Sequence, residues 1–494
     1  MQERTSNSEI KIQDQKIQQN KELSIWEALI PVFALIAMLG YNVSVFGDDA
    51  LSGSNQFVLL LGGTVAALIG FRNKVSYKLM MDEVAENIKS TSSAILILLM
   101  VGALAGTWLI SGIIPSMIYY GLQILNPTIF LAACLIICAV ISVATGSSWT
   151  TAATVGIALI GISEALGISL GMTAGAVLSG AYFGDKMSPM SDTTNLAPAM
   201  AGTDLFTHIR YMTYTTVPTF IVTLIVFIIL GFTQTATGSA STEAMLADID
   251  KAFNITPALF IVPILVIILI VKKTPPLIAL LAGTILGGVF ALIFQPNIVM
   301  QITGAEKLDF TSAYKGVMKA ITVKTSVATD NEVLKDLFTA GGMVKMLGTI
   351  WLILCAMVFG GIMDAIGALA RISSYMLNLF DSVFGLFAST VFTCIGLNIT
   401  ASDQYLALVV PGKMYAKAYK DKGLAPENLS RTLEDSGTVT SVLIPWNTCG
   451  AYHSGVLGVP VIDYAFYAVF NWLSPFMTLL FAALRIKIRE IKSK

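Results

Sequence analysis

The chain has 494 residues, of which 55% are hydrophobic and only 12% are charged, and its formal net charge is −1. Soluble globular proteins carry about 25% charged residues, so this composition excludes an ordinary soluble protein and indicates an all-α membrane protein that crosses the bilayer many times. A net charge near zero provides no basic field that would attract nucleic acid, so we expect no nucleic-acid partner.

The chain begins with a polar segment, residues 1–23, that carries charges of both signs. It lacks the basic, apolar and small-residue order of a cleaved signal peptide, and we expect a cytoplasmic tail. Uninterrupted apolar stretches follow, each long enough for a bilayer core of about 30 Å once tilt or a small shortfall is allowed. These predicted spans are residues 24–46, 56–71, 93–112, 211–232, 256–271, 274–294, 346–366 and 460–484.

Four further apolar stretches are interrupted by polar residues, glycines or prolines. We predict hairpins, either re-entrant or fully spanning, at 127–163 and 382–410, and broken helices at 170–201 and 434–458. Irregular backbone at membrane depth is tolerated only where protein or water surrounds it, so these interruptions are expected inside the molecule. Together with the spans they give about ten to fourteen membrane segments.

Lysine and arginine are concentrated in the tail, in the 72–92 and 411–433 loops and in residues 485–494. Because cytoplasmic loops carry an excess of these residues, we place these segments, and therefore both termini, in the cytoplasm. The 233–255 loop is mainly acidic and is placed outside the cell. Counting the membrane crossings between them also places the long segment 295–345 outside the cell.

An internal repeat relates these elements to one another. The stretch GALAGTWLISG at Gly102–Gly112 has a counterpart in AMVFGGIMDA at Ala356–Ala365, and the polar break TGSSWTT at Thr145–Thr151 has one in ITASDQY at Ile399–Tyr405. The order of span, hairpin, broken helix and final span is the same in both halves, although residue identity is low and chance similarity is the alternative. The topology gives the halves opposite orientations, as in many secondary transporters, whose ion sites lie where the broken helices meet.

This repeat divides the chain into consecutive parts. The linking part between the halves contains the spans 256–271 and 274–294 and the extracellular segment 295–345. The full division is a cytoplasmic tail at 1–23, scaffold spans at 24–92, a first inverted repeat at 93–232, the linking part at 233–345, a second inverted repeat at 346–484 and a cytoplasmic tail at 485–494.

The first polar break contains Ser147, Ser148 and Thr150 beside Gly146. Glycine lets the backbone unwind, and hydroxyl and carbonyl oxygens are hard ligands that suit Na⁺, so we expect these three hydroxyl residues to bind an ion. The alternative is that they only allow close helix packing or bond to carbonyls of the preceding turn.

The first broken helix carries Asp185, Lys186 and Asp192, and Pro189 prevents one continuous helix there. Charge in hydrocarbon costs at least about 2.5–3.5 kcal/mol per group, so these residues are expected to be functional. A carboxylate in a medium of low dielectric constant can exchange a bound proton for Na⁺. The alternative for Asp185 is a structural ion pair with Lys186 or a helix cap. The residues after Asp192 add further oxygen donors, among them Thr194 and Asn195.

The second half offers counterparts to these residues. Asp403, next to Ser402, lies between two apolar runs, so we expect its carboxylate to be buried. Asp435 and Asn447 are further candidates for the ion or substrate site. Glu434 and Asp435 follow a basic loop, however, and as an alternative they are solvated acids at a helix N-terminus near the membrane interface.

The other residue types that bind metals or catalyse reactions form no pattern. His208, near Arg210, is expected at the membrane interface, and the five cysteines lie in apolar stretches and are expected as small core residues. We find no phosphate-binding loop and no catalytic triad, so we expect neither an enzyme nor an ATP-driven pump.

Three segments resemble the NhaC family of bacterial Na⁺/H⁺ antiporters: GSSWTTAATVG at Gly146–Gly156, GAYFGDKMSPMSDTTNLAP at Gly180–Pro198 and EDSGTVTSVLIPWNTCG at Glu434–Gly450. The resemblance implies a moving transport domain built from 127–201 and 382–458, a scaffold built from the other spans, and a homodimer. It also implies candidate carboxylates. These are Asp185, Asp192, Asp403 and Asp435, the first three as ligands of the transported Na⁺.

We therefore predict a transporter of the bacterial plasma membrane that exchanges Na⁺ for H⁺ by alternating access, with the lipid bilayer as its surroundings and no cofactor besides the transported ions. The first alternative is a Na⁺- or H⁺-coupled exchanger of small carboxylates such as malate and lactate. No arginine lies in the apolar middle of a predicted span to pair with such a substrate, which favours simple cation exchange. A passive cation channel is the second alternative.

Overall fold

The computed structural model describes residues 23–46, 50, 53–124, 126–233, 239–329, 332–377 and 382–491. Almost all of them are helical, and the one sheet in this part of the chain has two strands. Nine of the described helices are long and apolar enough to cross a membrane, or ten if one bent pair, Glu243–Ala252 with Pro257–Val271, is counted as a span. The predicted all-α membrane class is confirmed, but a count of nine is below the predicted ten to fourteen segments and a count of ten is at its lower limit.

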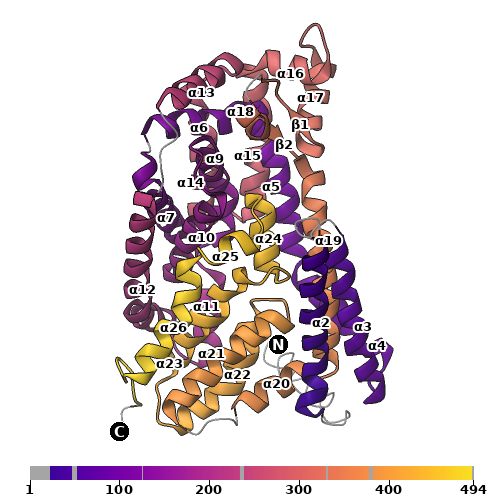
Figure 1. The fold of residues 1–494 in the computed structure, drawn as a ribbon, viewed down its shortest axis with the longest axis vertical. Coiled ribbons are helices and arrows are strands. Elements are labelled where there is room, and N and C mark those ends of the chain that lie inside the picture. The colour runs from indigo at the N-terminus through magenta and orange to yellow at the C-terminus, as the bar shows by residue number, and fades with distance from the viewer. Residues whose placement is uncertain are drawn as a thin grey trace.

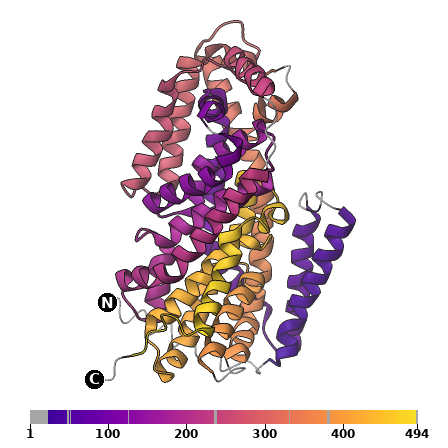
Figure 2. The same cartoon turned by 60° about the vertical axis from the view of Figure 1, so that its left-hand side comes forward.

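The N-terminal helices form a group at one side of the molecule (Figure 2). They pack on α19 (Gly342–Ala365), which contacts both α3 and α4. Nearly all of the predicted tail 1–23, and Asp48 and Asp49 of the following loop, lie outside the described residues. The bounds are α2 Ile25–Phe46, α3 Ser54–Arg72 and α4 Tyr77–Ser90.

The first half of the expected repeat begins with a long apolar helix and contains both predicted interruptions. The hairpin turns at residues 146–147, and the broken helix is interrupted at residues 188–191. The elements are α5 Ser92–Ile110, α6 Ile113–Ile124, α7 Pro127–Thr145, α8 Ser148–Thr151, the π-helix η2 Ala152–Gly156, α9 Ile157–Ala165, α10 Leu170–Met187, α11 Asp192–Ala201 and α12 Leu205–Thr233.

The linking part contributes the apolar helices α14 and α15, of which only α15 is by itself long enough to cross a membrane, and a group of short elements. The strands β1 and β2 pair antiparallel, with Thr325 opposite Ala340. The bounds are α13 Ser239–Ala252, the 3₁₀-helix η3 Pro257–Phe260, α14 Ile261–Val271, α15 Pro276–Phe294, α16 Pro296–Thr303, α17 Phe310–Thr322, β1 Thr325–Ser326, α18 Glu332–Leu337 and β2 Thr339–Ala340.

The second half also contains a hairpin and a broken helix, and its correspondence to the first half stays a prediction. One difference from the prediction is the last span, 460–484, which consists of two helices with an interruption at residues 466–468. The inverted orientation of the two halves stays a prediction. The elements after α19 are α20 Ala368–Leu377, α21 Val383–Thr400, α22 Leu406–Asp421, α23 Pro426–Leu433, the π-helix η4 Glu434–Thr438, the 3₁₀-helix η5 Ser441–Leu443, α24 Thr448–Leu457, α25 Val461–Ala465 and α26 Val469–Ala483.

Left-handed residues make the turns at both hairpin breaks. Gly146 has φ 70° and ends α7, and a side chain there would meet Met190 of the other break at 2.7 Å. Ser402 has φ 60°, which is uncommon for a residue with a side chain. Because such conformations persist only where the surrounding structure holds them, both breaks are fixed features of the fold.

The broken helix α10 packs closely on α7, because glycine spaced four residues apart lets two backbones approach. A Cβ atom added at Gly184 would lie 2.5 Å from the Ala139 carbonyl oxygen and 2.6 Å from the Val143 nitrogen, and Gly180 lies against the Leu135 carbonyl. This contact fixes the end of α10, and therefore Asp185, relative to the first hairpin.

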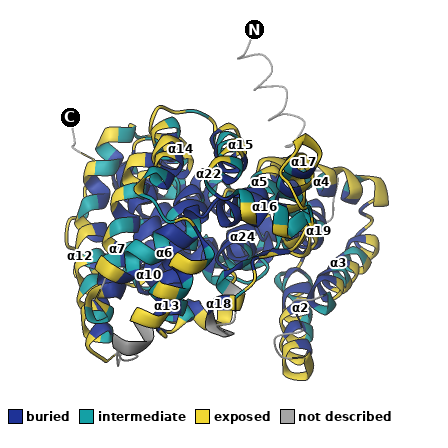
Figure 3. Ribbon diagram, turned by 90° about the horizontal axis from the view of Figure 1, so that it is seen from above, coloured by how far each residue is buried: buried dark blue, intermediate teal, exposed yellow. Residues whose placement is uncertain are grey.

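Helix α12 has its polar residues inside and its apolar residues outside. Thr215, Thr216, Thr219 and Thr223 are buried, while its other face exposes apolar side chains including Ile225. The same arrangement is visible in Figure 3, where exposed residues lie on the outer faces of the helices and buried ones lie between them. An apolar outer surface with threonines inside is typical of a protein solvated by lipid.

Segments that the topology places on different sides of the membrane lie at opposite ends of the molecule (Figures 1 and 2). The C-terminus and α22–α23 lie at one end, and α13, α16 and α17 lie at the other. This grouping supports the charge-based topology, in which these two sets of segments were placed on different sides of the membrane. The assignment of the basic end to the cytoplasm stays a prediction.

The close α7–α10 contact makes Gly184→Ala a specific test of the fold. Overpacking a tight contact costs about 1–3 kcal/mol, so we expect this variant to lower the thermal unfolding midpoint in detergent. The matched control is Gly40→Ala in helix α2, where an added Cβ meets nothing within 4 Å; it should leave the midpoint unchanged or raise it slightly, because alanine favours helix. Equal midpoints for the two variants would contradict the close packing.

Candidate functional site

A cavity of about 600 Å³ lies where three interrupted segments meet. Its walls come from the first hairpin break, from the break between α10 and α11, and from the second hairpin break, closed by the start of α5 and the α14–α15 turn. Five of the predicted site residues line it. They are Ser147, Thr150, Asp185, Asp192 and Asn195.

Asp185 lies near the end of α10 and is 7% exposed. One of its carboxylate oxygens accepts hydrogen bonds from the Ser148 hydroxyl at 2.6 Å and from the Ser148 backbone N–H at 3.2 Å. Ser148 is the first residue of the short helix that follows the Gly146 turn, so the hairpin break presents both donors to the acid. The structure therefore brings together two groups that the sequence analysis named separately, the acid of the broken helix and a hydroxyl of the first hairpin break.

The residues after Asp185 hold the helix break in shape. The Thr194 hydroxyl donates to the carbonyls of Asp185 and Lys186 at 3.2 and 3.1 Å, and the Asn195 amide donates to those of Pro189 and Ser191 at 3.0 and 2.7 Å. These donors stabilise the unwound backbone, a structural role that the sequence analysis did not assign to them.

Asp192 begins helix α11 and lines the cavity, but it is exposed. We expected a buried carboxylate, and for Asp192 this was wrong, because Ser191 rather than Asp192 caps the helix and leaves the Asp192 side chain in the open cavity. Asp185 and Asp192 both line the cavity. A cation in the cavity would therefore interact favourably with both carboxylates.

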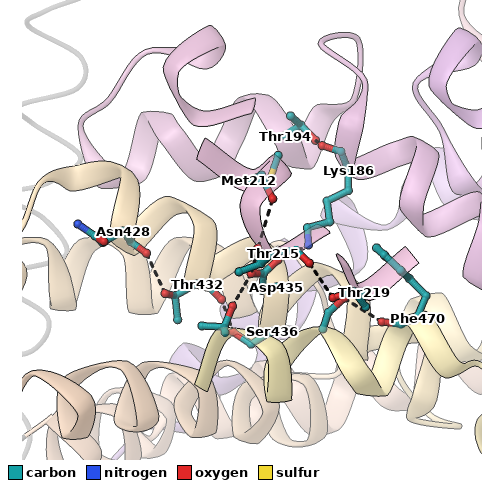
Figure 4. Close-up of polar contacts among 12 residues, drawn as sticks. Lys186, Thr194, Met212, Thr215, Thr219, Asn428, Thr432, Asp435, Ser436 and Phe470 are labelled. Atoms are coloured by element: carbon teal, nitrogen blue, oxygen red, sulfur yellow. Dashed lines mark hydrogen bonds and ion pairs between the residues drawn. The ribbon is translucent and has the colours of Figure 1, made fainter. Parts of the chain in front are cut away.

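Lys186 points away from the cavity and forms a buried ion pair with Asp435 of η4 (Figure 4). The other Asp435 oxygen accepts hydrogen bonds from the hydroxyls of Thr215 on α12, at 2.8 Å, and Thr478 on α26. The predicted alternative of an ion pair between Asp185 and Lys186 is therefore wrong, since the partner of Lys186 lies in the other half of the chain. Because its oxygens are already occupied, Asp435 is placed as a structural partner in this state.

The residues around this ion pair are more deeply buried in the protein than the sequence analysis expected. Glu434, Asp435 and His208 are all fully buried, whereas an interfacial position was expected for His208 and was the alternative for the two acids. Arg431, which was assigned to a basic loop, is also fully buried, and its guanidinium lies 4.6 Å from the centre of the Tyr211 ring. The α23–η4 segment packs between α12, α21 and α26, which removes these side chains from solvent.

The second hairpin break contributes to the site through residues next to the predicted ones. Asp403 is buried, as expected, but one of its carboxylate oxygens accepts from the backbone N–H groups of Tyr405 and Leu406 at 2.8 and 3.0 Å. It therefore caps α22. The cavity is lined instead by Gln404 and Tyr405, which were not predicted as site residues.

Asn447 and Ser402 join the two breaks of the second half. The Asn447 amide donates to the Asn398 backbone carbonyl at 3.0 Å and to its side-chain oxygen at 3.2 Å, and the Ser402 carbonyl accepts from the Thr448 N–H at 2.9 Å. Asn398 in turn donates to the Gly437 carbonyl at 2.7 Å, which lies in the π-turn η4. These predicted ligands thus connect the interruptions to each other and do not line the cavity.

No group of three or more histidine, cysteine or acidic side chains that could hold a metal ion occurs within the described ranges. The predicted combination of Asp185, Asp192 and Asp403 as Na⁺ ligands is therefore not formed in this state, because the Asp403 carboxylate binds the N-terminus of helix α22, which follows it in the chain. The first two remain together at the cavity, with hydroxyl oxygens beside them.

Two other cavity residues were missed by the sequence analysis. Lys273 lies in the α14–α15 turn with φ 65°, and Trp149 stacks on Tyr452 of α24 with ring centroids 3.9 Å apart. Trp149 belongs to the TGSSWTT break, so its position was a usable signal. Nothing in the sequence near Lys273 indicates that this turn lies against the break of another helix.

The comparisons with known proteins give a consistent family assignment. The model of the Na⁺/H⁺ antiporter family matches residues 180–486. The chain is 38% identical to the Na⁺/H⁺ antiporter NhaC of Alkalihalophilus pseudofirmus, covering 87% of this chain and 90% of that protein. It is 37% identical to the NhaC antiporter of Bacillus subtilis over 80% and 85% of the two chains, and 36% identical to the malate-2H⁺/Na⁺-lactate antiporter of that species over 91% and 92%.

The buried ion pair predicts a large loss of stability when one partner is removed. Lys186→Met or Asp435→Asn should each destabilise the protein by about 3–5 kcal/mol, because the other charge stays buried without a partner. The double variant should be less destabilised than the two single effects added together, as read from thermal unfolding midpoints in detergent.

The control for this prediction is Lys89→Met, which breaks the exposed Lys89–Glu86 pair on α4. Exposed pairs contribute about 0–1 kcal/mol, so its midpoint should stay close to that of the wild type. Additive effects in the double variant would show that Lys186 and Asp435 do not stabilise each other.

Proposed function

Because this chain belongs to the Na⁺/H⁺ antiporter family, we propose that it is a secondary active transporter that exchanges Na⁺ for H⁺ by alternating access. The observation that carries the proposal is the position of Asp185, a nearly buried acid at a helix break, beside the Ser148 hydroxyl and on the wall of a large cavity. A carboxylate on the cavity wall can be reached by ions in the cavity. When no ion is bound, it is only weakly solvated because the rest of its surroundings is protein.

Exchange follows if Na⁺ and H⁺ compete for the same carboxylate. With Na⁺ bound, the Asp185 carboxylate is ionised, and Asp192 and the hydroxyls of Ser147 and Thr150 supply further hard oxygen ligands. With a proton bound, Asp185 is neutral and has little affinity for Na⁺. Moving an ionised, empty carboxylate through the low-dielectric interior is costly, so the conformational change occurs only with Na⁺ or H⁺ bound to Asp185. Each Na⁺ carried in one direction is therefore followed by a proton carried in the other.

The Lys186–Asp435 ion pair contributes by keeping the site selective for cations. Lys186 is adjacent to Asp185 in the chain, and an unpaired ammonium there would repel Na⁺. Because Lys186 is paired with Asp435 and does not line the cavity, its ammonium does not offset the carboxylates of Asp185 and Asp192 that an incoming ion meets there.

We extend the proposal to the organisation of the molecule. Residues 127–201 and 382–458 form the moving transport domain, the other spans form the scaffold of a homodimer, and the protein resides in the bacterial plasma membrane with both termini in the cytoplasm. The composition of the cavity supports this division, since its walls combine hairpin-break residues with Ser90, Ser93 and Lys273 from outside the proposed transport domain.

The direct test is a vesicle assay with purified protein. Na⁺ added to acid-loaded proteoliposomes should drive proton efflux in the absence of any organic acid. A requirement for malate or lactate would favour carboxylate exchange instead, and conductive flux without counter-ion exchange would favour a channel.

Asp185→Asn should abolish Na⁺-driven proton efflux, lowering its rate at least about 100-fold, since the amide neither binds a proton for transport nor carries the charge that binds Na⁺. Asp82→Asn is the matched control, because Asp82 is exposed on α4; this variant should transport at the wild-type rate. Full exchange by Asp185→Asn with a normal unfolding midpoint would remove Asp185 from the site.

A second candidate function is exchange that includes a small organic carboxylate. The cavity of about 600 Å³ is far larger than a sodium ion requires and falls within the range of about 300–1,000 Å³ that is typical of small-molecule sites. Lys273 lines it and provides a cation for a substrate carboxylate. The similarity to a protein named as a malate-2H⁺/Na⁺-lactate antiporter points in the same direction.

Lys273→Gln separates the two candidates. If a carboxylate is transported, this variant should lower its exchange by about 10–100-fold, which corresponds to the loss of one charge-assisted hydrogen bond, and should leave Na⁺-driven proton efflux within about twofold. Lys272→Gln is the matched control, since Lys272 is exposed and does not line the cavity. Equal effects of both variants on malate or lactate exchange would contradict a role for Lys273.

A further inference from the structure

Basic residues are concentrated where the chain leaves its last helix. Residues 485–494 contain five lysines and arginines and one glutamate, and they follow α26 almost directly. The C-terminus lies beside α23 at one end of the molecule (Figure 1). Basic clusters next to a membrane span attract anionic lipid headgroups. Composition alone does not place these charges in space, but the contacts of the segment do.

The described part of this tail, residues 485–491, is held against α23 and forms the C-terminal strap. The Ala425 N–H, just before α23, donates to the Arg489 carbonyl at 2.9 Å, and the Asn428 amide of α23 donates to the same oxygen at 2.7 Å. The Arg489 guanidinium pairs with the Glu427 carboxylate at 2.7 Å. The strap therefore has a defined position on the folded protein.

Lys487 is the residue of the strap that reaches α12. Its φ of 51° is uncommon for a residue with a side chain, and such a conformation persists only where the surrounding structure holds it. The Tyr211 hydroxyl of α12 donates to the Lys487 carbonyl and supplies that support. The Lys487 ammonium lies 4.9 Å from the centre of the Tyr214 ring, so the strap places a cation against α12.

The side of α12 that carries Tyr214 points out of the protein. Its exposed residues recur every three or four positions, which puts them on one face of the helix. They are Arg210, Tyr214, Val217, Ile221, Ile225 and Ile228. The charged and the aromatic residue both lie at the end of this face next to the strap, and the remaining residues are aliphatic. Such an arrangement is typical of a membrane helix whose basic and aromatic residues lie at the level of the lipid headgroups.

We propose that Arg210 and Lys487, beside Tyr214, bind the phosphate of an anionic phospholipid from the leaflet at this end of the molecule. The two cations come from different elements to the same ring, and neither forms an ion pair with another described residue. A phosphate accepts charge-assisted hydrogen bonds from both, and the acyl chains lie along Val217 and Ile221. A zwitterionic phospholipid carries its own ammonium group, which offsets its phosphate, so the patch prefers a lipid with a net negative charge.

The bound lipid stabilises the element that carries the buried ion pair. The strap contacts the start of α23, and α23 continues directly into η4 with Asp435. Along this path the Thr432 hydroxyl donates to the Asn428 carbonyl at 2.8 Å (Figure 4). A lipid that fastens the strap therefore fastens α23, and the unfolding midpoint reports its binding without any transport.

The first test uses the full-length wild type in an uncharged detergent. Added phosphatidylglycerol should raise the thermal unfolding midpoint to a plateau, and phosphatidylcholine with the same acyl chains should not. Equal shifts with the two lipids would overturn the proposal, whether or not any variant folds. Inorganic phosphate should leave the midpoint unchanged, and a shift as large as that with phosphatidylglycerol would show that the patch binds a free anion instead.

The second test removes the two cations. The double variant Arg210→Gln/Lys487→Gln should need roughly 30-fold more phosphatidylglycerol for the same shift, because each cation near an anionic surface strengthens binding roughly fivefold. The matched control is Lys417→Gln/Lys420→Gln, which removes the same charge from exposed positions on α22 at the same end of the molecule. It should need the wild-type amount, and equal responses of the two double variants would overturn the proposal.

A second copy of the chain is the alternative occupant of this face of α12. Native mass spectrometry separates the two, since it counts both subunits and bound lipids. We expect the double variant Arg210→Gln/Lys487→Gln to lose bound phosphatidylglycerol and keep the wild-type number of subunits. A changed subunit number with unchanged lipid binding would overturn the proposal. None of these measurements requires transport, so their outcome is independent of the proposed antiport function.

Discussion

The ion pair between Lys186 and Asp435 is the interaction on which the arrangement of the site depends. Removing two charges from water costs several kcal/mol per ion, and a buried pair is stable only with good geometry and additional hydrogen bonds. Here the hydroxyls of Thr215 and Thr478 supply those bonds from two further helices. Four elements, α10, η4, α12 and α26, are thereby held at one point between the two halves of the chain (Figure 4).

The position of Asp185 follows from this ion pair. Successive residues near the end of a helix point in different directions, so the direction that takes Lys186 toward Asp435 leaves Asp185 free to face the first hairpin and the cavity. The close contact at Gly184 brings the same helix end against α7. The dipeptide Asp185–Lys186 thus combines an acid that ions can reach with a lysine that has a structural role. The two side chains can serve different roles because the helix points them in different directions.

Sequence reasoning identified the interrupted helices and their residue types but not the contacts between them. Glycine, proline and charged residues inside apolar stretches are local signals, and the breaks at Gly146, Pro189 and Ser402 were predicted from them. Asp185 and Ser148 were both named as candidates because they lie in polar breaks, but the hydrogen bond between them was not predicted. The pairing of Lys186 with Asp435 was missed, since nothing local indicates which of several acids a lysine will reach.

Burial was misjudged for a related reason. Glu434, Arg431 and His208 lie next to basic or polar segments, so an interfacial position was the natural expectation, yet all three are fully buried. Conversely, Asp192 lies in an apolar stretch but is exposed, because the cavity brings solvent to it. Hydropathy along the chain reports the average surroundings of a segment, and it cannot report a cavity or a covering helix contributed by residues far away in sequence.

The predicted repeat gives these differences a simple interpretation. The prediction aligns Gly184–Asp185 of the first half with Glu434–Asp435 of the second, although Asp185 lies in the α-helix α10 and Asp435 in the π-helix η4. In the first half the preceding glycine permits close packing on α7, and the aspartate stays available to the cavity. In the second half that aspartate is occupied by Lys186 from the first, and the preceding position carries the unpartnered Glu434. The two halves therefore divide the acidic chemistry between them: one supplies Asp185 at the cavity, and the other supplies Asp435, the partner that binds the neighbouring Lys186.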